Sequence, residues 1–311
     1  MLTIYKTDQG VCHKLKKVEE GCWISLTSPT SKELDEVSMD YNIDPDDLRA
    51  ALDEEEASRI ELEDDYTLIL VDVPIVEERN EEEVYTTIPL GIILVNEIVI
   101  TVCSKDVPVL ADFAVNKIKQ FSTKKRMRFV YLILFRTAST YQRILRVIDK
   151  RRVDIESRFD ESSTEINDMI ALHELETTLV YFETSLRGNE VVLNRLSLYK
   201  RIDQFPEDTE LLDDVIIENK QAIEMAVIYK DVISGTRELL STIEDSRLNN
   251  AMKFLTSITL VMAIPTIVSG FYGMNVPLPL AKWAHSFSFL TILTIAVCII
   301  VLIILKKKHM L

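Results

Sequence analysis

Acidic residues are missing from the C-terminal part of this chain of 311 residues. Although the sequence holds 50 Asp and Glu residues, none follows Asp245, and five lysines are the only formal charges from position 251 onward. These last residues therefore carry +5 and residues 1–250 carry −20, which together give the net charge of −15. A body this acidic repels phosphate, so nucleic acid is disfavoured as a partner. The rich apolar content of both parts excludes a disordered chain.

Signatures of nucleotide binding and of catalysis are also missing. The sequence has neither a GxxxxGK[ST] loop nor a GxGxxG loop, and its cysteines show no CxxC spacing. The histidines are too dispersed for a metal cage or a catalytic triad. The residues concerned are His13, His173, His285 and His309, with Cys12, Cys22, Cys103 and Cys298. We therefore expect no enzyme, and we expect reduced, structural thiols.

Two long uncharged stretches stand near the C-terminus. They are Phe254–Tyr272, with 19 residues, and Ser286–Leu305, with 20. A hydrocarbon core of about 30 Å needs about 20 helical residues at 1.5 Å each, so both stretches fit a membrane. Pro265 inside the first stretch does not argue against a span, because neighbouring helices can satisfy the carbonyl that it frees. Met1–Gly10 lacks the apolar core of a signal peptide.

The basic residues around the two spans predict their orientation. Arg247 and Lys253 precede the first span and Lys306–Lys308 follow the second, whereas the loop between the spans holds only Lys282. The positive-inside rule then places both termini in the cytoplasm and residues 273–285 outside. We expect a multi-pass protein of the plasma or inner membrane.

β-branched and aromatic residues predict mixed α/β structure over residues 1–105. Asn96-Glu97 is typical of a hairpin turn, and Pro45 after Asp44 is a helix start signal. The expected helices are Ser31–Tyr41 and Asp44–Asp53. The expected strands are Leu2–Tyr5, Cys22–Leu26, Tyr66–Val73, Val84–Leu94 and Ile98–Val102.

Helical patterns fill the middle of the chain. Pro108 opens a helix, and apolar and charged residues alternate at helical spacing over Arg128–Lys200, with only Gly188 as a breaker. We expect a turn over Arg201–Glu210 with Pro206 as its stop signal. One helix of about 90 Å should then run over Leu211–Tyr272. A helix this long needs partners along its length, which predicts a stalk built from several subunits.

The predicted fold is an α/β N-terminal cytoplasmic domain followed by long helices and two C-terminal transmembrane α-helices. Six segments follow from these patterns. They are the α/β domain (1–127), a cytoplasmic helical hairpin segment (128–210), a stalk helix continuing into the first transmembrane helix (211–272), an outer loop (273–285), a second transmembrane helix (286–305) and a basic cytoplasmic tail (306–311).

One face of the first span consists of small or hydroxylated residues above Leu255. It fits tight packing against another helix, because small residues let membrane helices approach closely. It also fits the lining of a pore, where hydroxyls and carbonyls freed from the helix would bind water without presenting a fixed charge. The face runs through Asn249, Met252, Leu255, Thr259, Ala263, Thr266 and Gly270.

The chemistry of this face limits the ion that could cross it. The face has no carboxylate, so a bare divalent cation would lose its hydration and gain too little in return. Amide and hydroxyl oxygens suit a cation that keeps its first-shell water, whereas tight inner-sphere binding calls for acidic rings.

The span ends at Tyr272-Gly273-Met274-Asn275, and here the sequence resembles the CorA family of divalent-cation channels. The family's mark is a Gly-Met-Asn triplet that closes the first of two C-terminal membrane helices. The context adds specificity, because Met252-Lys253 opens the span, Pro265 lies within it, and Gly270-Phe271-Tyr272 precedes the triplet. A short loop, a second span and a terminal lysine cluster follow, as in the family.

The resemblance implies a homopentameric funnel whose first spans surround an axial pore. It also implies an outer selectivity ring that receives hydrated Mg²⁺, an apolar inner constriction that gates by dewetting, and ion-stabilising positions farther out. The matching residues are Gly273, Met274 and Asn275 for the ring, Asn249, Met252 and Leu255 for the constriction, and Thr266 and Gly270 for the positions farther out.

The resemblance further implies regulation by divalent cations bound between neighbouring cytoplasmic domains, which hold the pore shut. Asp214 matches one of the carboxylates involved, but the acid that pairs with it in well-known members aligns with Ala50. Asp47, Asp53 or Glu54 would have to replace that acid in a regulatory metal site. Bound cations would also relieve repulsion between five bodies at −20 by about 1 kcal/mol per close pair.

The outer loop departs from the family's pattern as well. Val276–His285 has no acidic residue and contains Lys282, so the loop concentrates cations less than an acidic loop would. The predicted function is passive, membrane-potential-driven influx of hydrated Mg²⁺, with Co²⁺ or Ni²⁺ as further candidates, gated by intracellular divalent cations. Two alternatives stay open: a Zn²⁺-transporting variant of the family, against which Met274 argues, and a membrane-anchored oligomeric sensor or scaffold without transport.

Overall fold

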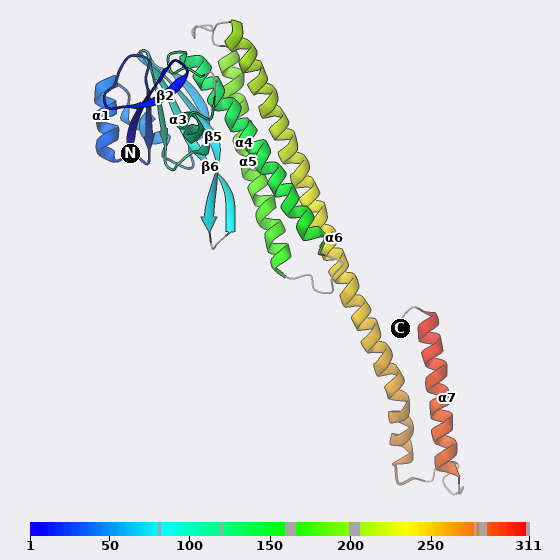
Figure 1. The fold of residues 1–311 in the computed structure, drawn as a ribbon. Coiled ribbons are helices and arrows are strands. Elements are labelled where there is room, and N and C mark those ends of the chain that lie inside the picture. The colour runs from blue at the N-terminus through cyan, green and yellow to red at the C-terminus, as the bar shows by residue number, and fades with distance from the viewer. Residues whose placement is uncertain are drawn as a thin grey trace. The chain divides into compact units, whose positions relative to one another are not determined.

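The computed structural model of the chain describes residues 1–79, 82–118, 121–158, 166–198, 206–276, 279 and 285–308. The chain separates into two compact units, Met1–Thr236 and Arg237–Leu311. The first unit holds a β-sheet with helices packed on it, and the second holds two long apolar helical segments (Figure 1).

The first unit is built on a seven-stranded sheet with the strand order β2-β1-β3-β7-β6-β5-β4. β3 and β7 pair in parallel, and the other neighbours pair antiparallel. The strands are β1 Leu2–Asp8, β2 Val11–Leu15, β3 Trp23–Thr27, β4 Arg59–Leu62, β5 Tyr66–Arg79, β6 Glu82–Val95 and β7 Ile98–Cys103.

All five expected strands are confirmed, with ends that differ by a few residues. The expected hairpin turn is confirmed as well, since Asn96 joins β6 to β7 with a φ of 47°. The sequence prediction missed β2 and β4, the two edge strands. Both are short and carry polar residues (VCHKL and RIEL), so pairing with β1 and β5 rather than local preference makes them strands.

Successive residues of β5 belong to two different apolar cores, one on each face of the sheet. Ile69 and Val71 lie in the first core, whereas Leu68 and Leu70 lie in the second. Side chains alternate along a strand, so a run that is apolar at every position marks a sheet covered on both faces. Helices α1 (Ser31–Tyr41) and α2 (Pro45–Ala50) cover the second core. The first core lies under α3 (Pro108–Ala114), α4 (Arg126–Glu156), α5 (Ile166–Leu198) and the start of α6 (Pro206–Tyr272).

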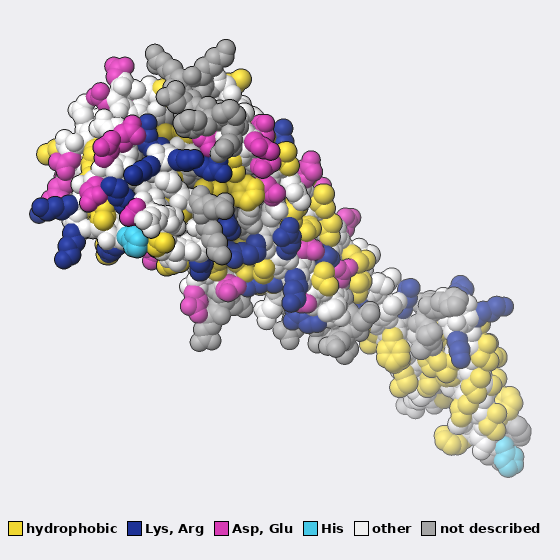
Figure 2. Space-filling view, turned by 45° about the horizontal axis from the view of Figure 1, so that its top comes forward, with side chains coloured by type: hydrophobic (Ala, Val, Ile, Leu, Met, Phe, Trp, Pro, Cys, Tyr) yellow, Lys and Arg dark blue, Asp and Glu magenta, His cyan; other side chains and the backbone are white. Residues whose placement is uncertain are grey.

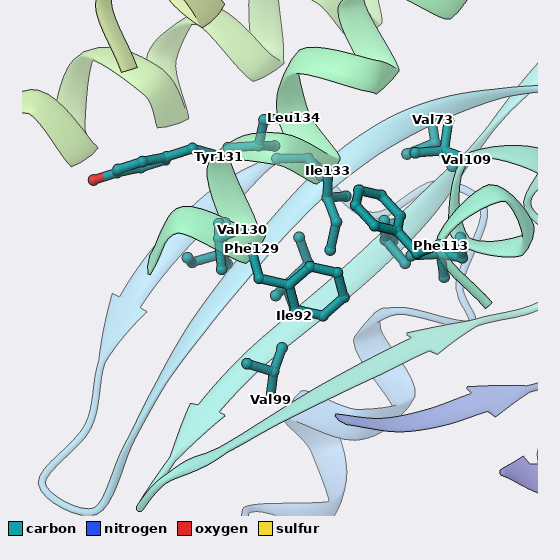
Figure 3. Packing of buried hydrophobic residues seen from close by; sticks show 14 of the residues in the cluster. Val73, Ile92, Val99, Val109, Phe113, Phe129, Val130, Tyr131, Ile133 and Leu134 are labelled. Carbon is teal, nitrogen blue, oxygen red and sulfur yellow. The ribbon is translucent and has the colours of Figure 1, made fainter. Parts of the chain in front are cut away.

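Aromatic side chains join α3 and α4 to the sheet. The rings of Phe113 and Phe129 meet edge to face with centroids 5.1 Å apart, and Phe121 approaches Phe113 at 5.0 Å. Figure 3 shows Phe129 reaching from its helix toward Ile92 and Val99 on the sheet. Pairs in this geometry are worth about 0.5–1.5 kcal/mol beyond the area they bury.

Hydrogen bonds and ion pairs hold α6 against α4 and α5. Gln142 of α4 donates from Nε2 to the carbonyl of Glu218 at 3.0 Å, and Asn219 donates from Nδ2 to a carbonyl of α5 at 3.0 Å. Lys230 Nζ lies 2.6 Å from Glu183, which also pairs with Arg187. Together these two cations lower the pKa of the Glu183 carboxyl. The stalk part of α6 up to Thr236 is therefore tied into the first unit.

Three sequence predictions about the helices are wrong in detail. Pro206 begins α6 instead of ending a turn, because proline suits the first helical position, where no N–H is needed; residues 201–205 lie outside the described residues. Gly188 lies inside α5, where a Cβ atom would come within 3.1 Å of Ser58 Oγ, so the glycine serves close packing rather than a break. The helix expected over Asp44–Asp53 is the shorter α2.

Candidate pore-lining site

The two apolar helices of the second unit, the end of α6 and α7 (Ser286–Lys307), are each long and apolar enough to cross a membrane. They run antiparallel, since Ser257 and Leu302 line one groove while Val261 contacts Cys298. One stripe of α6 is shielded by this pairing. Its members are Ser257, which is fully buried, and the half-buried Val261, Ile264 and Val268.

The predicted pore-lining face of α6 is left uncovered by α7. Met252 and Leu255 are 60% and 65% exposed. At 100° per residue, the centre of this face lies about 160° around the helix from the stripe against α7. α7 therefore packs on the side of α6 opposite this face and leaves the face free to contact water or another chain. The exposed residues are Asn249, Met252, Leu255, Thr259, Ala263, Thr266 and Gly270.

The threonine hydroxyl groups on the uncovered face donate hydrogen bonds to main-chain carbonyls. Thr259 donates from Oγ1 to the carbonyl of Leu255 at 2.8 Å, and Thr266 donates to the carbonyl of Met262 at 2.9 Å. A hydroxyl has one proton and two lone pairs. Each threonine thus presents acceptor lone pairs outward, which suits the outward-pointing hydrogens of water molecules around a cation.

Pro265 frees a carbonyl, but that carbonyl does not lie on the uncovered face. Proline has no N–H for the residue four positions earlier, which is Val261. The Val261 carbonyl instead accepts a hydrogen bond from the thiol of Cys298 on α7, with Sγ 3.8 Å away. The expectation that a freed carbonyl adds to the pore face is therefore wrong at this position. The role of Cys298 as a donor was not predicted from the sequence, although the acceptor that Pro265 leaves without a partner was a signal for it.

The Gly-Met-Asn triplet lies directly after α6 and is exposed. The Gly273 N–H donates to the Ser269 carbonyl at 2.9 Å, and the Met274 N–H donates to the Phe271 carbonyl at 3.2 Å, so the triplet continues the last turn. A Cβ atom on Gly273 would lie 3.3 Å from the Ser269 carbonyl oxygen, closer than ordinary contact. Met274 is 54% exposed and Asn275 is exposed beside it.

The predicted regulatory carboxylates have different surroundings. Asp47 in α2 accepts a hydrogen bond from the Tyr66 hydroxyl, and burial together with this bond raises the pKa of Tyr66. Asp53 accepts a hydrogen bond from the Glu55 N–H at 3.1 Å, and Asp214 is exposed on α6. Over the described ranges, no group of three or more His, Cys, Asp or Glu side chains is arranged to hold a metal ion.

A single chain does not bring Asp47 and Asp214 together. Asp47 precedes Leu48, which belongs to the core under α1 and α2. Asp214 precedes Val215, which belongs to the core on the other face of the sheet. Ala50 is 8% exposed, so an acid at this position would itself be buried. A shared metal site would need Asp214 of one chain and α2 of another.

The sequence matches a family model described as CorA-like Mg²⁺ transporter protein over residues 18–307. The chain belongs to the CorA family. It is 29% identical over 296 residues to the cobalt/magnesium transport protein CorA of Methanocaldococcus jannaschii, covering 92% of this chain and 90% of that protein. The complete structure of the M. jannaschii CorA magnesium transporter superposes with a TM-score of 0.84 at 26% identity, covering 98% and 96% of the two chains.

The CorA similarity confirms the predicted fold class, with an N-terminal α/β domain, long helices and two C-terminal apolar helices. The cytoplasmic domain of ZntB from Vibrio parahaemolyticus also superposes, with a TM-score of 0.52 at 11% identity over 78% of this chain and 95% of that chain. At that identity the second likeness concerns the fold alone.

Proposed function

We propose that five copies of this CorA chain surround an axial pore that conducts hydrated Mg²⁺ into the cell, with Co²⁺ and Ni²⁺ as further permeant ions. The observation that carries the proposal is the uncovered face of α6, with its acceptor lone pairs at Thr259 and Thr266. The family description and the name of the M. jannaschii relative support Mg²⁺ and Co²⁺.

The uncovered face suits a cation that keeps its water shell. Mg²⁺ gives up inner-shell water reluctantly, and its bound water molecules need acceptors around them. Threonine hydroxyls whose protons are committed offer acceptors and no donor, so they also disfavour anions. The face carries no fixed charge that would hold the ion in place, which allows the ion to leave.

The two ends of the pore have different roles in this proposal. Gly273, Met274 and Asn275 form the outer ring, where the carbonyls of Gly273 and the amides of Asn275 contact the hydrated ion. Met252 and Leu255 are bulky, apolar and exposed on the same face, so five copies of each close the inner end by dewetting. We place the protein in the plasma or inner membrane, with both termini in the cytoplasm.

The membrane potential supplies the driving force, since the sequence has no phosphate-binding loop for ATP. An ion of charge 2+ moving inward gains about 4.6 kcal/mol per 100 mV. Internal Mg²⁺ closes the pore by binding between neighbouring bodies, where Asp214 of one chain faces Asp47 or Asp53 of the next. The position of these acids on opposite faces of the sheet favours such an intersubunit arrangement.

Flux into liposomes that contain the purified full-length chain tests the proposal. Asn275→Ala should lower Mg²⁺ uptake about tenfold or more, because the ring loses its amide contacts. Asn250→Ala is the matched control, since Asn250 is exposed on α6 but outside the uncovered face, and it should leave uptake unchanged. Unchanged uptake in Asn275→Ala favours a sensor or scaffold, and faster uptake of Zn²⁺ than of Mg²⁺ favours the zinc alternative.

A further inference from the structure

A small apolar groove lies between α6 and α7 within the second unit. It is lined by Ser257, Ile258, Val261, Met262 and Leu302 and has a volume of about 180 Å³. Ile258, Met262 and Leu302 are 43%, 63% and 40% exposed, so the groove is open along one side of the helix pair. An apolar cavity of about 150 Å³ is large enough to bind benzene, so this groove has room for a segment of hydrocarbon chain.

Lysines lie one helical turn beyond the groove, at the same end of both helices. Lys253 precedes Ser257 by four residues, and Lys306 follows Leu302 by four. Because the two helices are antiparallel, both lysines lie about 6 Å beyond the groove in the same direction along the helix axes. Lys307 and Lys308 follow directly, and all three terminal lysines are exposed. Figure 2 shows basic side chains gathered at one end of the apolar segment. The sequence after Asp245 contains no acid that could neutralise them.

We propose that this groove binds an anionic phospholipid, with an acyl chain between α6 and α7 and the phosphate against Lys253 and Lys306–Lys308. Basic pockets between transmembrane helices on the cytoplasmic side recognise anionic headgroups. The occupant is a lipid rather than a soluble phosphate, because the lining of the groove is apolar at four of its five residues. The inference rests on the membrane orientation in the proposed function.

Native mass spectrometry of the full-length chain in detergent tests the inference, with phosphatidylglycerol and phosphatidylcholine as probes. The wild-type chain should bind phosphatidylglycerol more tightly than phosphatidylcholine. Lys253→Gln together with Lys306→Gln should weaken phosphatidylglycerol binding about 10- to 30-fold. Lys282→Gln is the matched control, since it removes a lysine from the loop at the other end of the spans and should leave binding unchanged.

A second variant separates a built site from diffuse surface charge. Leu302→Trp fills the groove and leaves every lysine in place, so it should also weaken phosphatidylglycerol binding. Three results would each overturn the inference. The first is that Leu302→Trp binds phosphatidylglycerol as tightly as the wild type. The others are that the Lys253/Lys306 and Lys282 variants have equal effects, or that inorganic phosphate competes fully with the lipid. Lipid binding is measured without an ion gradient, so it does not depend on ion flux. If the chain binds the lipid but takes up no Mg²⁺, the result contradicts the proposed function and leaves the lipid site in place.

Discussion

The hydrogen bond from Cys298 to the Val261 carbonyl should stabilise the helix pair only when proline occupies position 265. Removing the thiol by Cys298→Ala leaves the Val261 carbonyl without a donor in apolar surroundings. An unsatisfied buried acceptor costs about 1–3 kcal/mol. A thiol is a weak donor and the Sγ–O distance is 3.8 Å, so we expect the low end, about 1 kcal/mol.

The Pro265→Ala background removes the need for the thiol. An alanine at this position restores an N–H that donates to the Val261 carbonyl within the helix, so Cys298→Ala should then cost little. The double-mutant cycle should therefore show a coupling energy of about 1 kcal/mol between positions 265 and 298. Cys298→Ser keeps a donor and should resemble the wild type in both backgrounds.

Thermal unfolding of the purified full-length chain in detergent measures this coupling. With proline at position 265, Cys298→Ala should lower the midpoint by roughly 2–4 °C, and with alanine there the two curves should nearly coincide. An equal loss in both backgrounds would refute the reasoning, since it would mean that Cys298 contributes packing volume rather than a hydrogen bond to Val261.

Two further predictions concern the pore face and the α/β unit. Thr266→Val keeps the shape of the side chain but removes the acceptor lone pairs of the hydroxyl. Mg²⁺ flux into liposomes should therefore fall several-fold, while the thermal stability stays unchanged. Unaltered flux would contradict the role given to this hydroxyl. Hydrogen bonds from the N–H groups of Thr30 and Leu2 lower the pKa of Glu33 to about 2. Glu33→Gln should therefore lower the free energy of unfolding by about 1 kcal/mol at pH 7, allowing for the partial exposure of the carboxyl. This difference from wild type should shrink as the pH falls from about 4.5 toward 2, because the wild-type carboxylate becomes protonated. A constant difference in the unfolding midpoint over that pH range would contradict the prediction.

Much of the fold could be predicted because several segments carry strong local signals. The two apolar stretches at the C-terminus are visible in composition alone, and α1 matches its predicted bounds because Thr30 and Glu33 form a capping box. β2 and β4 could not be predicted, since they are strands only through pairing with their neighbours. Pro206 was ambiguous, because proline both ends helices and begins them.

The candidate site could be predicted only in part. The sequence identifies a small-residue face on the first span, but composition does not show which face α7 covers, because most residues around the helix are apolar. The direction of the threonine protons and the partner of the freed carbonyl depend on backbone geometry and on a residue 37 positions away. The separation of Asp47 from Asp214 depends on how the helices distribute over the two faces of the sheet.

The central claim is that the uncovered face of α6 lines a water-filled path, and neighbouring cysteine substitutions test it most directly. A Cys298→Ser chain keeps three native cysteines, Cys12, Cys22 and Cys103, and all three are buried. Burial raises the pKa of each thiol, to about 11 for Cys12 and Cys103, so they react slowly with thiol reagents. A charged, water-soluble thiol reagent should modify Ala263→Cys and block Mg²⁺ flux, and it should leave Ile264→Cys, one residue on and turned toward α7, unmodified with flux intact. Modification of Ile264→Cys with protection of Ala263→Cys would contradict the account.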